Sequence, residues 1–318
     1  MLEHKPLKKR WKTGNCCNKS NKQMRKMYYT LLYYAMLLMG RWFPRPLLYW
    51  CARRAAEIRY IFQPNLRKTV KENIRIVLEY RKTTRGQSYT EEELHRLVKN
   101  AFHNFGVYLA DFFYIPRWSN RLIERQVQIE GIELLDEHLA GGNGVIALTG
   151  HIGNWELSGV IAAILGYKVT AVAIPYLNSS VTGICNRIRN SQGLEVILTG
   201  ENPKKLLKTF KENRVLAVLG DRVFTEKGMN IKFLGVDAVL PRGPATLAIR
   251  MKTPLVAGFF VKEDHGYRFF FQRIPLPPPS PTEEEKIDFL VSKGAEVLEQ
   301  VIMDYPDQWL NFAPIRNL

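Results

Sequence analysis

Beyond Gly131, the sequence alternates between short apolar runs rich in β-branched residues and longer stretches with helical spacing. The expected strands are residues 145–149, 169–174, 195–198, 215–219, 230–234, 254–261 and 267–273, and the expected helices are residues 154–165, 178–191, 203–212, 244–251 and 282–303. Strands that alternate with helices form a largely parallel sheet, because each helix carries the chain back across one face of it. The predicted fold class is therefore α/β, a mixed, largely parallel central sheet with helices on both faces. The last strands follow each other closely, which favours an antiparallel pair at one edge.

The first part of the chain lacks this alternation. Helical spacing covers residues 66–78 and 91–113, and a separate apolar run covers residues 27–39. We expect three parts: a basic, poorly ordered tail at 1–26, a membrane-anchor helical segment at 27–62, and a globular domain at 63–318.

The apolar run is shorter than the ~20 residues that span a bilayer. Extending it to Trp50 takes in Arg41 and Arg45, which are costly at membrane depth. Basic residues flank both ends, and the tyrosines and tryptophans in between favour the headgroup level. We therefore favour an anchor that lies in the membrane plane or re-enters the membrane, rather than a helix that spans it. A soluble buried helix is the remaining alternative.

The net charge of +16 is confined to one end of the chain. Residues 1–85 hold 21 Lys and Arg against 4 Asp and Glu, whereas the rest of the chain holds 25 against 26. A nucleic-acid enzyme more often spreads its basic residues around a groove. The charge therefore indicates an anionic membrane surface as a partner and argues against nucleic acid.

The most informative segment is residues 144–159, Gly-Val-Ile-Ala-Leu-Thr-Gly-His-Ile-Gly-Asn-Trp-Glu-Leu-Ser-Gly. An apolar strand ends there, and His151 follows between Gly150 and Gly153, just before a helix. Ligand sites of open α/β sheets lie at such strand-to-helix turns. Glu156 falls in the first turn of the helix, where the helix dipole favours its ionised form.

This arrangement suits general base catalysis. We expect Glu156 to accept the imidazole N–H of His151, so that His151 can take a proton from an attacking hydroxyl. Backbone amides of the glycine-rich turn would hold the oxyanion. The alternative is a hydrogen-bonded loop histidine. The spacing does not match a metal site, which needs three protein ligands.

Five further residues are candidates for substrate binding: Arg187, Arg189, Asp221, Arg242 and Gly243. The arginines suit a phosphate, and Arg242 with Gly243 precedes a proline that can open a helix. Asp221 follows an apolar strand and is expected to orient Arg189 or the surroundings of His151. Each arginine could equally be a solvated surface charge, and Asp221 a capping residue.

Residues 151–156, His-Ile-Gly-Asn-Trp-Glu, resemble the His-x4-Asp/Glu block of the glycerolipid acyltransferase superfamily, and specifically that of the bacterial lipid A biosynthesis (lauroyl/myristoyl) acyltransferases. Further blocks are similar in order and spacing: residues 186–193 with Arg187 and Arg189, residues 219–222 (Leu-Gly-Asp-Arg), residues 228, 233–235 and 241–248, and residues 305–310 (Tyr-Pro-Asp-Gln-Trp-Leu). The resemblance covers about residues 27–312.

The resemblance implies a glycerol-3-phosphate acyltransferase-like fold, an acyltransferase domain at 63–318 and an N-terminal membrane helix. It implies acyl carrier protein or coenzyme A as the acyl donor, a lipid A precursor as the acceptor, and no cofactor or metal. The location implied is the cytoplasmic face of a bacterial inner membrane. Two departures concern the acceptor more than the chemistry: Arg222 stands where the family usually has Gln, and the C-terminal end lacks the family's basic, aromatic cluster.

Two other functions compete with acyl transfer to a lipid hydroxyl. An esterase or thioesterase would use water as the acceptor, although the Gly-x-Ser-x-Gly element of α/β-hydrolases is missing from the sequence. A non-catalytic membrane- or nucleic-acid-binding protein is the other, and the neutral bulk of the chain argues against nucleic acid.

Overall fold

The computed structural model describes residues 17–176, 178–223, 228–279 and 282–315. Its helices are α1 (Cys17–Trp42), α2 (Arg45–Phe62), α3 (Pro64–Arg85), α4 (Glu91–Tyr114), the short 3-10 helix η1 (Ile115–Arg117), α5 (Asn120–Gln126), α6 (Glu133–Leu139), α7 (Trp155–Ile164), α8 (Ser179–Asn190), α9 (Lys204–Lys211), α10 (Gly243–Met251) and α11 (Glu283–Asp304). Its strands are β1 (Val127–Glu130), β2 (Val145–Thr149), β3 (Val169–Ala173), β4 (Glu195–Leu198), β5 (Val215–Leu219), β6 (Gly228–Phe233), β7 (Val236–Pro241), β8 (Leu255–Glu263) and β9 (Gly266–Arg273).

Seven strands form the central sheet in the order β1-β9-β8-β2-β5-β3-β4. The pairs β8–β2, β2–β5, β5–β3 and β3–β4 are parallel, whereas β8 and β9 are antiparallel. The predicted α/β class with a mostly parallel sheet is confirmed. The antiparallel pair lies one strand in from the edge, because β1 adds outside β9 and parallel to it.

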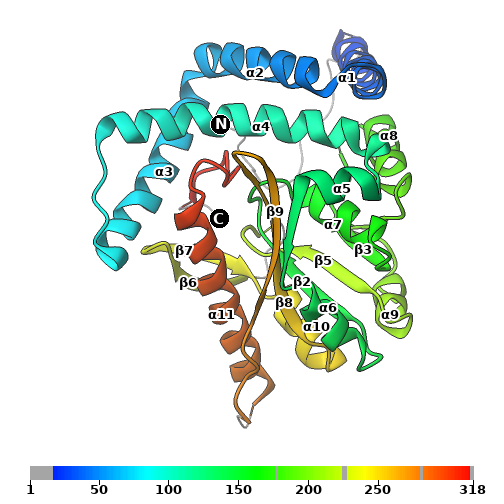
Figure 1. The fold of residues 1–318 in the computed structure, drawn as a ribbon, viewed down its shortest axis with the longest axis vertical. Coiled ribbons are helices and arrows are strands. Elements are labelled where there is room, and N and C mark those ends of the chain that lie inside the picture. The colour runs from blue at the N-terminus through cyan, green and yellow to red at the C-terminus, as the bar shows by residue number, and fades with distance from the viewer. Residues whose placement is uncertain (1–16, 177, 224–227, 280–281, 316–318) are drawn as a thin grey trace.

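The strand expected at 230–234 is not part of this sheet. It is β6, which pairs with β7 in a separate two-stranded antiparallel sheet beside α11 (Figure 1). The sequence did not predict β7 or β1.

Helices cover both faces of the central sheet. On one face, α10, α11 and the β6–β7 hairpin pack on alternate strand residues such as Ile146 and Leu148. On the other face, α6, α7 and α8 pack on Val145, Val169 and their neighbours. This alternation follows from strand geometry, since successive side chains point to opposite faces.

Helix α3 contacts α11, whereas α1, α2 and α4 lie at one end of the sheet (Figure 1). Helix α4 crosses that end, and α1 and α2 lie on the far side of α4 (Figure 1). The α2–α4 contact is close, since a Cβ at Gly106 would lie 2.7 Å from the carbonyl oxygen of Ala52. Helix α2 is therefore integrated into the fold, and it buries Leu48 and Ala56.

Of the tail expected at residues 1–26, the last part belongs to α1, which begins at Cys17; residues 1–16 lie outside the described residues. Of the helices in the described ranges, none combines the length and the apolar character needed to cross a bilayer.

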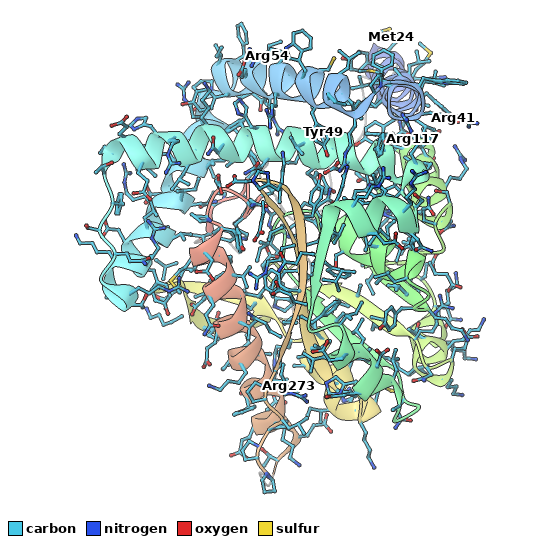
Figure 2. The ribbon with its side chains drawn as sticks, in the orientation of Figure 1. Met24, Arg41, Tyr49, Arg54, Arg117 and Arg273 are labelled. Atoms are coloured by element: carbon cyan, nitrogen blue, oxygen red, sulfur yellow. The ribbon has the colours of Figure 1, made fainter. Side chains whose placement is uncertain are left out.

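The outer surface of α1 and α2 carries many exposed apolar side chains. The large apolar side chains most exposed there are Met24, Met27, Tyr28, Tyr29, Leu31, Tyr34, Leu38, Trp42, Leu47, Trp50, Ile58, Ile61 and Phe62. We call this set the α1–α2 apolar face. In Figure 2, Arg54 lies on the outer side of α2, whereas Tyr49 lies between α2 and α4.

Candidate active site

His151 lies just beyond the carboxyl end of β2, in the turn that leads to α7. The C-terminal segment holds this turn: Leu310 N donates to the His151 carbonyl oxygen (2.7 Å), and Gly153 N donates to the carbonyl oxygen of Gln308 (2.8 Å). Gly153 has a φ of 59°, and a Cβ there would collide with the carbonyl of Phe260. The turn thus requires glycine at this position. The His151 side chain is 12% exposed.

The imidazole pairs with Asp221. His151 Nδ1 lies 2.8 Å from Asp221 Oδ1, and the His151 amide donates to Asp221 Oδ2 (3.1 Å). The cause is strand register, because β2 and β5 are parallel neighbours that align Val145 with Val215. Paired residues of the two strands are therefore 70 positions apart in the sequence. His151 and Asp221 each lie two residues beyond the end of their strand, so the same pairing places them opposite each other.

Asp221 is fully buried, and Trp309 Nε1 donates to its Oδ2 (3.0 Å). Burial raises the pKa of its carboxyl, but His151, Arg222 and Trp309 together outweigh burial and hold the pKa well below its usual range. Asp221 is therefore a permanent hydrogen-bond acceptor, which fits an N–H on Nδ1 of the imidazole. In that tautomer the basic lone pair of His151 is on Nε2.

The structure differs from the expectation that Glu156 accepts the imidazole N–H, because Asp221 lies at Nδ1. Both carboxylate oxygens of Glu156 accept from Arg189, at 2.8 Å from Nε and 2.6 Å from Nη2. Glu156 is in the first turn of α7 and Arg189 is near the end of α8, and both are buried. The charge on Glu156 raises the pKa of Arg189 despite the opposing effect of burial, as expected for a bidentate pair.

The prediction that the turn's amides hold an oxyanion is also contradicted for three of them. The amides of His151 and Gly153 donate to Asp221 and Gln308, and the amide of Asn154 donates to the Phe260 carbonyl oxygen (2.8 Å). These N–H groups already have acceptors within the fold.

Aromatic side chains line one side of the imidazole. The Trp155 ring meets the His151 ring edge-on, with centroids 4.9 Å apart, and stacks on Tyr108 of α4 at 4.2 Å. Burial raises the pKa of Tyr108 well above its usual range, helped by the neighbouring charge of Glu156. Tyr108 is consequently neutral at working pH.

The other predicted binding residues are not brought to His151 by any contact among the described residues. Arg187 is exposed and donates to the Tyr34 hydroxyl of α1 (3.2 Å). Arg242 pairs with Glu284 (2.6 Å) and Asp288 (2.9 Å) of α11, so its charge is already compensated. Gly243 opens α10 next to open space.

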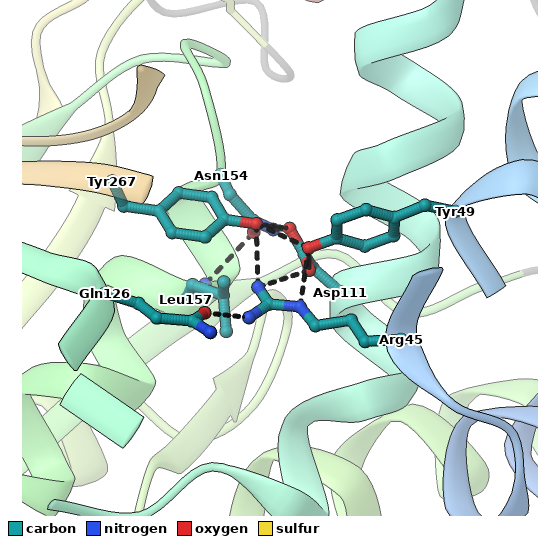
Figure 3. A network of polar contacts seen from close by, with 7 residues as sticks. All are labelled: Arg45, Tyr49, Asp111, Gln126, Asn154, Leu157 and Tyr267. Atoms are coloured by element: carbon teal, nitrogen blue, oxygen red, sulfur yellow. Dashed lines mark hydrogen bonds and ion pairs between the residues drawn. The ribbon is translucent and has the colours of Figure 1, made fainter. Parts of the chain in front are cut away.

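A buried polar network lies between α2 and the His151 turn (Figure 3). At its centre, Asp111 of α4 accepts from Tyr267 OH (2.6 Å), from Arg45 Nη2 (3.1 Å) and from Tyr49 OH (2.5 Å). Asn154, the N-cap of α7, donates to Asp111 at 3.5 Å and accepts from the amide of Leu157. The network therefore connects α2 with the start of the helix that carries Glu156.

Sequence reasoning did not identify the roles of Trp309 or Asp111. Trp309 stood only in the C-terminal block on which the resemblance rested. Asp111 lies inside a helical apolar pattern, where a single acidic residue gives no signal of its partners.

The fold and the site define a class of α/β proteins that carry a histidine–carboxylate pair at the carboxyl edge of a mostly parallel sheet. Within that class, the chain belongs to the bacterial lipid A biosynthesis acyltransferase family, whose model matches residues 17–314.

Curated relatives fall into two groups. A phosphatidylinositol mannoside acyltransferase of Mycobacterium tuberculosis (strain CDC 1551 / Oshkosh) is 29% identical over 54% of this chain, and the match spans 57% of the relative's length. The enzyme of the same name from Mycolicibacterium smegmatis is 26% identical over 69% of this chain and 71% of the relative. A lipid A biosynthesis palmitoleoyltransferase of Escherichia coli (strain K12) is 20% identical over 89% of each chain.

Proposed function

We propose that this protein is a membrane-attached O-acyltransferase that moves a fatty acyl chain from an acyl thioester to a hydroxyl of a glycolipid. The observation that carries the proposal is the hydrogen bond from His151 Nδ1 to the buried Asp221 (2.8 Å), at the edge of the sheet where ligands of α/β folds bind. Membership of an acyltransferase family supports it.

In the proposed reaction, Asp221 holds the imidazole so that Nε2 of His151 takes the proton from the acceptor hydroxyl. The hydroxyl oxygen forms a bond to the thioester carbonyl carbon, and the carbonyl π electrons move to its oxygen. When that tetrahedral species collapses, the C–S bond breaks and the thiolate takes the proton from His151. The products are an ester and a free thiol. Glu156 acts here through Arg189, as a support of the site.

The donor proposed is acyl carrier protein or acyl-coenzyme A. For the acceptor, a lipid A precursor follows from the family, and phosphatidylinositol mannoside is the second candidate, because relatives bearing that name are 26–29% identical whereas the lipid A enzyme is 20% identical. Both acceptors are glycolipids.

We place the protein on the cytoplasmic face of a bacterial inner membrane. The α1–α2 apolar face would contact the lipid, and the basic N-terminal quarter would favour anionic headgroups. A basic surface can also attract an acidic carrier protein.

The test combines purified protein, a labelled acyl thioester and each of the two acceptors. We expect labelled acyl glycolipid, and we expect His151→Ala to reduce transfer about 10²–10⁴-fold, the range for general base catalysis. His265→Ala, at an exposed turn, is the matched control and keeps full activity. Free fatty acid as the main product would instead indicate a thioesterase, and full transfer by His151→Ala would reject this site.

A further inference from the structure

Arg222 follows the imidazole's partner directly in the chain, yet it has few contacts of its own. Its guanidinium is half-buried, and Nη2 donates to the carbonyl oxygen of Leu310 (3.2 Å). Nε is buried and has no hydrogen-bond partner. Among the described residues, neither Nε nor Nη1 of the guanidinium therefore has an acceptor.

Arg222 forms no ion pair with a described residue, unlike three other arginines that the fold largely encloses. Arg45 pairs with Asp111, Arg189 with Glu156, and Arg214 with Glu195. Among the described residues, the carboxylate whose charge acts on Arg222 is that of Asp221, and its two oxygens accept from His151 and Trp309. Burial accordingly lowers the pKa of Arg222, and Asp221 offsets that effect only in part. A largely buried guanidinium without an ion-pair partner is incompletely solvated, and an anionic oxygen of a ligand would complete its solvation.

Arg222 is linked to the His151 turn through two of its neighbours, Leu310 and Asp221. Leu310, which accepts from Arg222, donates its amide to the His151 carbonyl oxygen at 2.7 Å. Asp221, which directly precedes Arg222 in the chain, accepts from His151 Nδ1 at 2.8 Å. The reaction needs a donor for the negative charge on the thioester oxygen, and the amides of His151, Gly153 and Asn154 are already used.

We propose that Arg222 is a further catalytic residue, whose guanidinium N–H groups donate to the thioester carbonyl oxygen as it becomes negative. The inference rests on the proposed acyl transfer. As the acceptor oxygen bonds to the carbonyl carbon, its proton moves to His151 and the π pair moves to the oxygen facing Arg222. The two cations then each face an anion, the imidazolium facing Asp221 and the guanidinium facing the oxyanion. Collapse of this species expels the thiolate, which takes the proton from His151.

The test measures kcat and acceptor KM for three variants. Arg222→Met keeps the length of the side chain without a donor, and we expect its kcat to fall roughly 10²–10³-fold, as for the loss of one oxyanion donor. The acceptor KM should change only a few-fold. Arg222→Gln keeps one N–H donor and should lose less. Arg222→Ala should regain activity when guanidinium ion is added, which a purely structural role would not produce.

Arg273→Ala is the matched control, since Arg273 lies at the end of the molecule far from α4 (Figure 2) and pairs with the exposed Glu137. It should keep its kcat with or without guanidinium. An unchanged kcat in folded Arg222→Met, a loss confined to the acceptor KM, or no response of Arg222→Ala to guanidinium would each overturn the assignment. Absence of transfer by the wild-type protein would instead reject the proposed function.

Discussion

The carboxylates of Asp221 and Glu156 have different partners in the site. Asp221 accepts from the imidazole at 2.8 Å, whereas Glu156 is bound at both oxygens by Arg189. The side chains of Glu156 and Arg189 are 10% and 7% exposed, so neither charge has much access to water. At such a pair, removing one charge leaves the other buried and uncompensated.

Glu156→Gln should therefore destabilise the fold, by about 3–5 kcal/mol of unfolding free energy, the range for a broken buried ion pair. Urea denaturation measures this. The double variant Glu156→Gln/Arg189→Met removes both charges and should recover part of the loss. Wild-type stability of Glu156→Gln, together with loss of transfer, would mean that Glu156 serves the imidazole after all.

At the scale of elements, the network around Asp111 connects four parts of the chain: α2 through Arg45 and Tyr49, α4 through Asp111 itself, β9 through Tyr267, and α7 through Asn154 (Figure 3). Asp111 is 1% exposed. Arg45 also lies over the rings of Tyr49, Tyr114, Trp118 and Tyr267, so its charge is both paired and enclosed.

Asp111→Ala removes the acceptor of four donors and leaves Arg45 without its carboxylate. We expect a loss of about 3–5 kcal/mol in unfolding free energy, measured by chemical denaturation. Asp237→Ala is the control, because Asp237 is 88% exposed in its pair with Lys232, and it should change stability by less than about 1 kcal/mol. Equal effects of the two substitutions would contradict the role given to the network.

Local pattern was enough to predict most elements. The helix expected at 154–165 is α7 at Trp155–Ile164, and the strands expected at 145–149, 195–198 and 215–219 have the predicted bounds. Short apolar runs rich in β-branched residues and the helical spacing between them carry that information. Strand β1 was missed because its sequence, Val-Gln-Ile-Glu, has polar residues at every second position and no continuous apolar run.

The pairing of elements was not readable from the sequence. Asp221 meets His151 because β5 pairs with β2, and no local pattern fixes strand order. The spacing of five residues between His151 and Glu156 suggested a local contact, but α7 carries Glu156 toward α8. Arg45 was similarly interpreted as a charge near the membrane, whereas it is mostly buried against Asp111.

At the scale of the molecule, the site and the α1–α2 apolar face lie at the same end. Asn154 of the His151 turn contacts Asp111 of α4, and α1 and α2 lie on the opposite side of α4 (Figure 1). If that face sits on lipid, two stacked helices, α2 and α4, separate the bilayer from the site.

Substitution of Trp50 and Phe62 by Ser should weaken binding to anionic lipid vesicles. The two side chains are 60% and 77% exposed, and burying a large apolar side chain contributes about 1.5–3 kcal/mol, so each loss should be roughly tenfold or more. Vesicle sedimentation measures it. Leu276→Ser is the control, since Leu276 is 75% exposed away from α1 and α2. An equal effect of the control would reject the α1–α2 face as the docking surface.

If Asp221 makes His151 a base for acyl transfer, the substitution Asp221→Asn must slow the transfer step. The single-turnover transfer rate of this variant measures that effect most directly. An amide at this position cannot fix the same tautomer, so we predict a fall of about 10²–10⁴-fold in folded protein. Glu156→Gln, corrected for the fraction folded, should fall by less. Folded Asp221→Asn that transfers the acyl chain at the wild-type rate would contradict the account.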